Sequence, residues 1–190
     1  MREQEITQSG IKLSIDVQDS LICPVCKKTL KLLNEQLLCT NNNCGACFPF
    51  VNCIPILINE QSSLFSINDF LTQRKTTFNL RESKLKKLAR RVIPNISRNI
   101  KGDSNNKKFV ELLLARSSAP KVLVVGAGNS GGGMGFLSRH SSVELVMTDV
   151  SFGSGIDIIC DAHDIPFADG FFDAVLVHAV LEHVVDPIGA

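Results

Sequence analysis

The sequence predicts an α/β protein in which a small cysteine-rich module precedes a parallel sheet covered by helices. Residues 122–125 form a short apolar run, typical of a parallel strand buried on both faces, and Gly126 and Gly128 follow it at once. Residues 144–149 predict a second strand, which ends in an acid about twenty residues beyond the glycines. Six of the seven cysteines fall within residues 23–53, which indicates a separate module.

Length and charge limit the class of protein. A chain of 190 residues has room for one domain and a small module, and 44% of its residues are hydrophobic. Residues 61–118 carry 13 basic and 4 acidic side chains, whereas residues 119–190 carry 2 and 9. The N-terminus is charged and lacks the apolar segment of a secretory signal, and no apolar run is long enough to span a membrane. We therefore expect a cytoplasmic protein with a basic middle and no membrane span.

Four segments are expected along the chain. They are a leader (1–19) without assigned function and with one short strand over residues 11–17, a cysteine ribbon (20–60), a basic helical connector (61–118) and an α/β core (119–190). In the connector, apolar residues at helical spacing predict a first helix that Pro94 ends, and a second helix is expected over residues 106–116. The apolar positions of the first helix are Leu85, Leu88, Ala89 and Val92.

The cysteine spacing predicts a structural metal site. In a reducing compartment, clustered cysteines indicate metal binding rather than disulfides. A Cys-x-x-Cys turn supplies two thiolates, and a second pair at this distance completes a tetrahedral zinc site; an iron–sulfur cluster or another redox centre is the alternative. Five cysteines compete for four ligand positions: Cys23, Cys26, Cys39, Cys44 and Cys47.

The ribbon resembles a known zinc-ribbon family. Leu38-Cys39 and the sequence CGACFP from Cys44 resemble the LxC and CGxxYP patterns of the family that includes the small activator subunit of transfer-RNA methyltransferases. The resemblance places the ligands at Cys23, Cys26, Cys39 and Cys44, with Cys47 as the alternative to Cys44. Cys53 replaces the glycine of the family's GIP turn, and we expect a small buried side chain there. Loss of one ligand is expected to unfold residues 20–58 and largely spare the rest.

A second resemblance concerns the α/β core. Residues 160–187 (CDAHDIPFADGFFDAVLVHAVLEHVVDP) closely resemble class I S-adenosylmethionine-dependent methyltransferases, with the pattern DAxxLPFxDxxFDxVxxxxxLEHxxDP. NAD and FAD sites share the glycine spacing and the acid, but dinucleotide dehydrogenases lack this pattern. The resemblance implies a Rossmann-like class I methyltransferase core. Its first four strands along the chain would be residues 122–125, 144–149, 156–160 and 172–177, followed by a helix from near Val180. In the sheet these strands would lie in the spatial order 3-2-1-4.

The expected site residues bind the cofactor rather than perform chemistry. Gly126 and Gly128 let main-chain amides approach the methionine end of S-adenosylmethionine, and Asp149 can accept both ribose hydroxyls. The resemblance implies that Asp161 binds the adenine amino group and that the main-chain N–H of Ala162 meets the ring. No catalytic residue is assigned; the weak candidates are His178, Glu182 and His183. Some small-molecule O-methyltransferases of this superfamily carry an ExxEH motif and hold a divalent ion. A metal ion is disfavoured here, because Ala179 replaces the first glutamate of that motif.

The core is expected to be incomplete and its acceptor stays unknown. Strands five to seven of the family sheet find no counterpart before Ala190, so we expect a fragment or a decayed copy with little activity on its own. Its fourth strand would form an apolar edge that a partner chain or an oligomer completes. The acceptor is a small molecule, a lipid, or RNA bound through the basic connector. The alternative function is a non-catalytic cofactor-binding module that acts through a partner.

Overall fold

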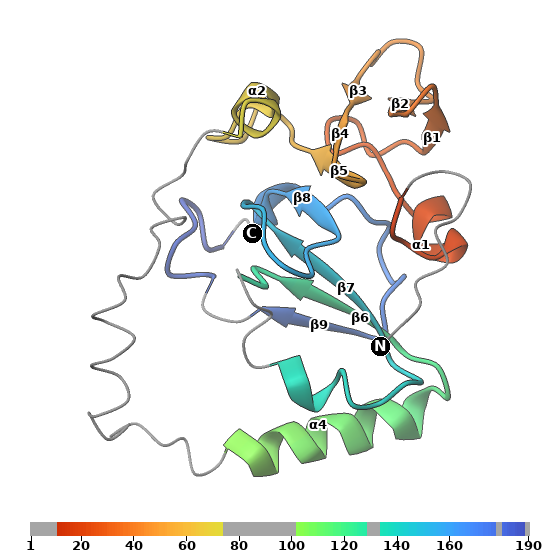
Figure 1. Cartoon of the computed structure of the whole chain (residues 1–190), viewed down its shortest axis with the longest axis vertical. Helices are drawn as coiled ribbons and strands as arrows, with labels where there is room; N and C mark the ends of the chain where they lie inside the picture. Colours follow the sequence, from red (N-terminus) through yellow and green to blue (C-terminus); the bar gives the residue numbers. More distant parts are fainter. Residues whose placement is uncertain (1–10, 74–101, 129–133, 178–179, 189–190) are drawn as a thin grey trace.

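The computed structural model describes residues 11–73, 102–128, 134–177 and 180–188 (Figure 1). Its first, three-stranded antiparallel sheet contains β1 (Leu30–Leu33), β2 (Gln36–Cys39) and β3 (Cys47–Phe48). A six-stranded sheet contains β4 (Phe50–Val51), β5 (Ile54–Leu57), β6 (Lys121–Val125), β7 (Glu144–Asp149), β8 (Ile158–Cys160) and β9 (Ala174–Val177). The helices are α1 (Ile15–Asp19), α2 (Ile67–Leu71) and α4 (Gly102–Arg116), with 3₁₀ turns at Met134–Phe136 and Ala162–Asp164.

The larger sheet confirms the α/β prediction. Its strand order is β4-β5-β8-β7-β6-β9, and every neighbouring pair except β4–β5 is parallel. Within this order, β8-β7-β6-β9 reproduces the expected spatial order 3-2-1-4 of a Rossmann-like core. The β9 strand lies at the edge of the sheet, where Val175 and Val177 are about half exposed.

The ribbon is continuous with this sheet, which the sequence did not indicate. Its last strand, β5, pairs in parallel with β8, so that Leu57 lies opposite Cys160. Before the first cysteine, Leu21 forms a β-bridge with Phe167, and the Ile22 N–H donates to the Pro166 carbonyl at 3.0 Å. Figure 1 shows β4 and β5 between the three-stranded sheet of the ribbon (β1–β3) and the core strands. Main-chain hydrogen bonds therefore join the two parts at two places.

Both faces of the sheet are covered, as expected for parallel strands. Along β6 the side chains alternate: Val122 and Val124 pack in a cluster with α4, and Leu123 and Val125 face the opposite side. There they meet a cluster built largely from the N-terminal part of the chain, including the buried residues Ile11, Leu13, Val17, Leu21, Cys23 and Phe48. The N-terminal part thus covers one face of the core sheet, and α4 covers part of the other (Figure 1).

The prediction of a strand over residues 11–17 is wrong, because α1 occupies Ile15–Asp19. The Ser14 side chain accepts a hydrogen bond from the Val17 N–H and caps this helix. The leader also packs in the core, since Ile11, Leu13 and Val17 are buried.

The helix expected from near Val180 is also absent from the described residues, where turns occupy 181–185. Pro187 disfavours helical geometry in the residue before it, so a helix that begins near Val180 could contain at most about seven residues. That is fewer than a stable isolated helix needs.

The expected helix over 106–116 is confirmed as part of α4. The expected helix that Pro94 ends lies outside the described residues. None of the described helices has the length and apolarity needed to cross a membrane.

Candidate functional site

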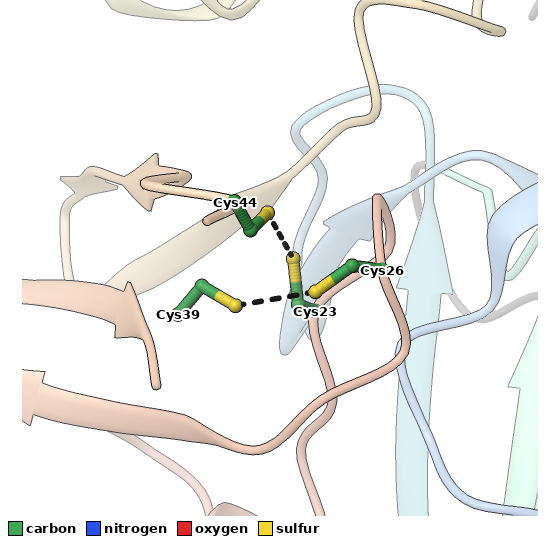
Figure 2. A group of neighbouring side chains, drawn as sticks. All are labelled: Cys23, Cys26, Cys39 and Cys44. Atoms are coloured by element: carbon green, nitrogen blue, oxygen red, sulfur yellow. Dashed lines mark hydrogen bonds between the residues drawn. The ribbon is translucent and has the colours of Figure 1, made fainter. Parts of the chain in front are cut away.

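Four cysteine side chains converge at the ribbon (Figure 2). The sulfur atoms of Cys23, Cys26, Cys39 and Cys44 all lie within 4.8 Å of one another. The Cys23 and Cys44 sulfurs are 3.9 Å apart, and the Cys26 and Cys39 sulfurs are 3.3 Å apart. In a tetrahedral zinc–thiolate site, sulfur–sulfur distances are about 3.8 Å. The donor set and its spacing therefore fit a closed four-cysteine metal site.

Main-chain hydrogen bonds shape the two cysteine turns. In the first turn, the Cys23 N–H donates to the Lys28 carbonyl and the Lys27 N–H donates to the Cys23 carbonyl. In the second, the Cys44 N–H donates to the Asn41 carbonyl. The Lys28 N–H holds the pKa of Cys26 at about 6, whereas burial raises the pKa of Cys23 to about 12. The lowered pKa of Cys26 favours the thiolate, the form that binds metal.

The two other ribbon cysteines lie outside this cluster. Cys47 precedes the buried Phe48 on β3, and because successive side chains of a strand point to opposite faces, Cys47 is exposed. Its sulfur donates to the Gln36 side chain at 3.1 Å. Cys53 is exposed, so the expectation of a buried side chain there is wrong. It occupies a hairpin turn with a φ of 65°, a left-handed conformation that glycine adopts more readily than cysteine.

The glycine turn after β6 is held against the end of β7. The Gly126 and Ala127 N–H groups donate to the Thr148 carbonyl at 2.9 and 3.1 Å. Gly126 has a φ of 69°, and a Cβ atom there would lie 2.1 Å from a methyl group of Val180. Only glycine therefore fits this position. The part of the loop at residues 129–133 lies outside the described residues.

Asp149 lies at the end of β7 and binds the glycine turn. One carboxylate oxygen accepts the Gly128 N–H at 2.8 Å, and the other accepts both the N–H and the hydroxyl of Ser151, at 2.9 and 2.8 Å. A carboxylate offers about four acceptor positions. One position thus remains for a ligand hydroxyl, and a second becomes available if the Ser151 hydroxyl rotates away.

Asp161 lies at the end of β8 and is only 7% exposed. Its Oδ1 atom accepts the His163 N–H at 3.1 Å and contacts His163 Nδ1 at 2.7 Å, and its Oδ2 atom accepts the Ser63 hydroxyl at 2.5 Å. Burial raises the pKa of Asp161, but the hydrogen bonds from Ser63 and His163 outweigh burial, so the pKa is lowered overall. The carboxylate is therefore ionised, and about one of its four acceptor positions is left.

A cavity of about 560 Å³ joins these groups, a size usual for small-molecule sites. It lies at the carboxyl ends of β6, β7 and β8, where open α/β sheets bind their ligands. All five expected cofactor residues line it or adjoin it: Gly126, Gly128, Asp149, Asp161 and Ala162. Of the weak catalytic candidates, His183 lines the cavity, Glu182 is exposed on the neighbouring turn and His178 lies outside the described residues.

Sequence reasoning missed three polar residues of the site. Ser151 and His163 each follow an expected acid by two residues, a spacing at which a side chain or N–H reaches the carboxylate, so both were in principle detectable. Ser63 had no such signal, because its position depends on the pairing of β5 with β8.

Part of the chain matches a known protein family. Residues 123–190 match the family model described as a methyltransferase domain, a span that includes most of β6 and all of β7, β8 and β9. The match supports a methyltransferase of unspecified acceptor. No curated protein matches the chain significantly.

Proposed function

We propose that the chain is an S-adenosylmethionine-dependent methyltransferase whose acceptor is still open. The observation that carries the proposal is the cavity at the carboxyl ends of β6, β7 and β8, with Asp149 and Asp161 on its wall. Each carboxylate keeps an acceptor position for a ligand donor, as described above. A ribose and an adenine amino group are donors of this kind.

When bound, the cofactor supplies an activated methyl group on its own sulfonium, so the protein mainly binds, orients and excludes water. Asp149 would hold the ribose, and Asp161 with the Ala162 N–H would hold the adenine edge. The turn at Gly126 and Gly128 brings main-chain amides close to the ligand. Val180 and Phe65 supply apolar wall.

The acceptor would approach from the mouth of the cavity. Of the candidates for contact with it, we propose His183, because it lines the cavity from the turn that follows β9. Small molecules, lipids and RNA all remain candidate acceptors. RNA is suggested by the basic residues of the connector, most of which lie outside the described residues.

For the ribbon we propose a structural zinc ion held by Cys23, Cys26, Cys39 and Cys44. A closed set of four thiolates leaves no coordination position for a substrate, which suits a structural role.

The cofactor assignment is tested by calorimetric titration with S-adenosylhomocysteine, with NAD⁺ as the competing ligand. We expect Asp149→Ala to weaken binding of S-adenosylhomocysteine by about 1.5–3 kcal/mol, since a hydrogen bond to a charged group is lost. Asp169→Ala is the matched control, because Asp169 is an exposed acid in the turn before β9. Preference for NAD⁺ would refute the assignment, and tight cofactor binding without methyl transfer to any acceptor would favour the non-catalytic alternative.

A further inference from the structure

The segment at residues 59–65 links the ribbon to the cofactor cavity. Because β5 and β8 are parallel and Leu57 lies opposite Cys160, both strands end at the same edge of the sheet. The residues that follow β5 therefore lie beside those that follow β8, including Asp161. Ser62, Leu64 and Phe65 line the cavity, and Asn59 is only 7% exposed. One wall of the cavity thus comes from outside the segment that matches the methyltransferase family.

Ser63 connects this segment directly to Asp161. Its hydroxyl donates to Asp161 Oδ2 at 2.5 Å, while His163 binds Oδ1. The two contacts hold both oxygens of the carboxylate, so its plane cannot rotate freely. The remaining acceptor position of Asp161, which lines the cavity, therefore has a defined direction.

Asp164 anchors the same segment to the ribbon. Its Oδ2 atom accepts the Asn59 amide at 3.1 Å and the Ser62 hydroxyl at 2.5 Å. Its Oδ1 atom accepts the Lys27 ammonium group at 3.0 Å, and Lys27 directly follows the ligand candidate Cys26. These hydrogen bonds lower the pKa of Asp164 although its burial raises it. One carboxylate therefore ties the cysteine turn and the segment at 59–65 to the loop after β8.

We infer that the segment at residues 59–65, which follows the last strand of the ribbon, is part of the cofactor site, and that Ser63 is a positioning residue that sets Asp161 for recognition of the adenine amino group. The inference rests on the proposed function. It assigns a role in cofactor selectivity to the junction between the ribbon and the connector.

The test compares S-adenosylhomocysteine with S-inosylhomocysteine, in which an oxygen replaces the adenine amino group. Wild-type protein should prefer S-adenosylhomocysteine in calorimetric titrations. For Ser63→Ala we expect that preference to fall by roughly 3- to 10-fold, since Asp161 keeps its charge but loses its fixed direction. Ser63→Thr keeps the hydroxyl and should restore the preference. The matched control Ser118→Ala changes an exposed serine between α4 and β6, at the opposite end of β6 from the cavity, and should leave the preference unchanged.

The outcomes separate this inference from the function on which it rests. If wild-type protein does not bind S-adenosylhomocysteine, both fail. If it binds and Ser63→Ala keeps the wild-type preference, the inference is wrong and the proposed function stands. If Ser63 had a purely structural role, Ser63→Ala would lower the unfolding temperature and would lower both affinities equally. The ratio of the affinities would then be unchanged, which also overturns the inference.

Lys27→Met gives a second measurement, because it removes the ion pair with Asp164 without touching the cavity, and we expect a smaller fall in the same ratio.

Discussion

At the scale of single residues, Asp157 links the packing of the sheet to pH. It precedes β8, where its carboxylate accepts the Met147 N–H at 2.8 Å and its own N–H donates to the Met147 carbonyl at 2.8 Å. Burial raises the pKa of Asp157 from 3.8 to about 6. Between these two pH values the folded state binds more protons than the unfolded state, so stability falls as pH rises through this window.

We therefore expect Asp157→Asn to stabilise the protein at pH 7–8. The amide keeps an acceptor for the Met147 N–H but carries no buried charge, and the shift in pKa corresponds to a gain of up to about 3 kcal/mol. Urea unfolding at several pH values measures this effect. The difference between variant and wild type should vanish below about pH 4, where both side chains are neutral. A difference that is the same at pH 3.5 and pH 8 would contradict the explanation.

How far the site could be predicted from sequence depends on what fixes each residue. Asp149 is the last residue of β7 and Asp161 directly follows β8, so strand prediction together with the family pattern could indicate that both lie at the same edge of the sheet, where both line the cavity. Ser63 is 98 positions away from Asp161 along the chain, and no local pattern relates the two. Its role follows from strand pairing, which a single sequence does not specify.

At the scale of elements, two hairpins of the ribbon have two-residue turns with positive φ at each position. Asn34 and Glu35 join β1 to β2, and Asn52 and Cys53 join β4 to β5. Such turns match the twist of antiparallel strands but favour asparagine and glycine. The second residue of each turn is therefore strained in this chain.

Replacing the strained cysteine should stabilise the ribbon. We expect Cys53→Gly to raise stability by roughly 1 kcal/mol, because the left-handed conformation costs a residue with a Cβ about that amount. Thermal unfolding under reducing conditions measures the change. Cys53→Ala keeps the Cβ and serves as the control, with no comparable gain expected. Equal stability of the glycine and alanine variants would show that the turn is not strained.

The identity of the fourth metal ligand also belongs to this scale. Strand alternation on β3 directs Cys47 away from the cluster to which Cys44 contributes. We expect Cys47→Ser to retain one zinc per chain and Cys44→Ser to lose most of it, as measured by elemental analysis of reduced protein. Zinc loss in the Cys47 variant alone would instead mean that Cys47 binds the metal in place of Cys44, the alternative that the sequence left open.

At the scale of the whole molecule, the N-terminal part of the chain is built into the core. Local patterns predicted the strands and the cysteine cluster well, because each depends on residues close in sequence. They did not show that residues 11–48 cover one face of the sheet, since that contact joins segments about a hundred residues apart. The same clusters explain why α4 covers part of the other face.

This arrangement changes the expected consequence of losing the metal. Sequence alone suggested that the ribbon would unfold and largely spare the core. In the structure Cys23 is buried in the same cluster as Leu123 and Phe167, and β5 pairs with β8. Unfolding the ribbon would thus expose one face of β6 and remove the neighbour of β8. Burial of each large aliphatic side chain contributes about 1.5–3 kcal/mol, so the exposed face represents a substantial loss.

We therefore predict that chelation of the proposed zinc lowers a single unfolding transition rather than melting the ribbon separately. A fall in Tm of roughly 10–20 °C would correspond to several kcal/mol for a chain of this size. Hydrogen exchange with mass spectrometry locates the change: protection should fall in β8 as well as in β1–β3, because β8 loses the hydrogen bonds to β5. The Cys47→Ser variant, which keeps the four clustered cysteines, is the control and should retain protection until chelator is added. Loss of protection confined to the ribbon, with β8 unchanged, would mean that the core is stable without it.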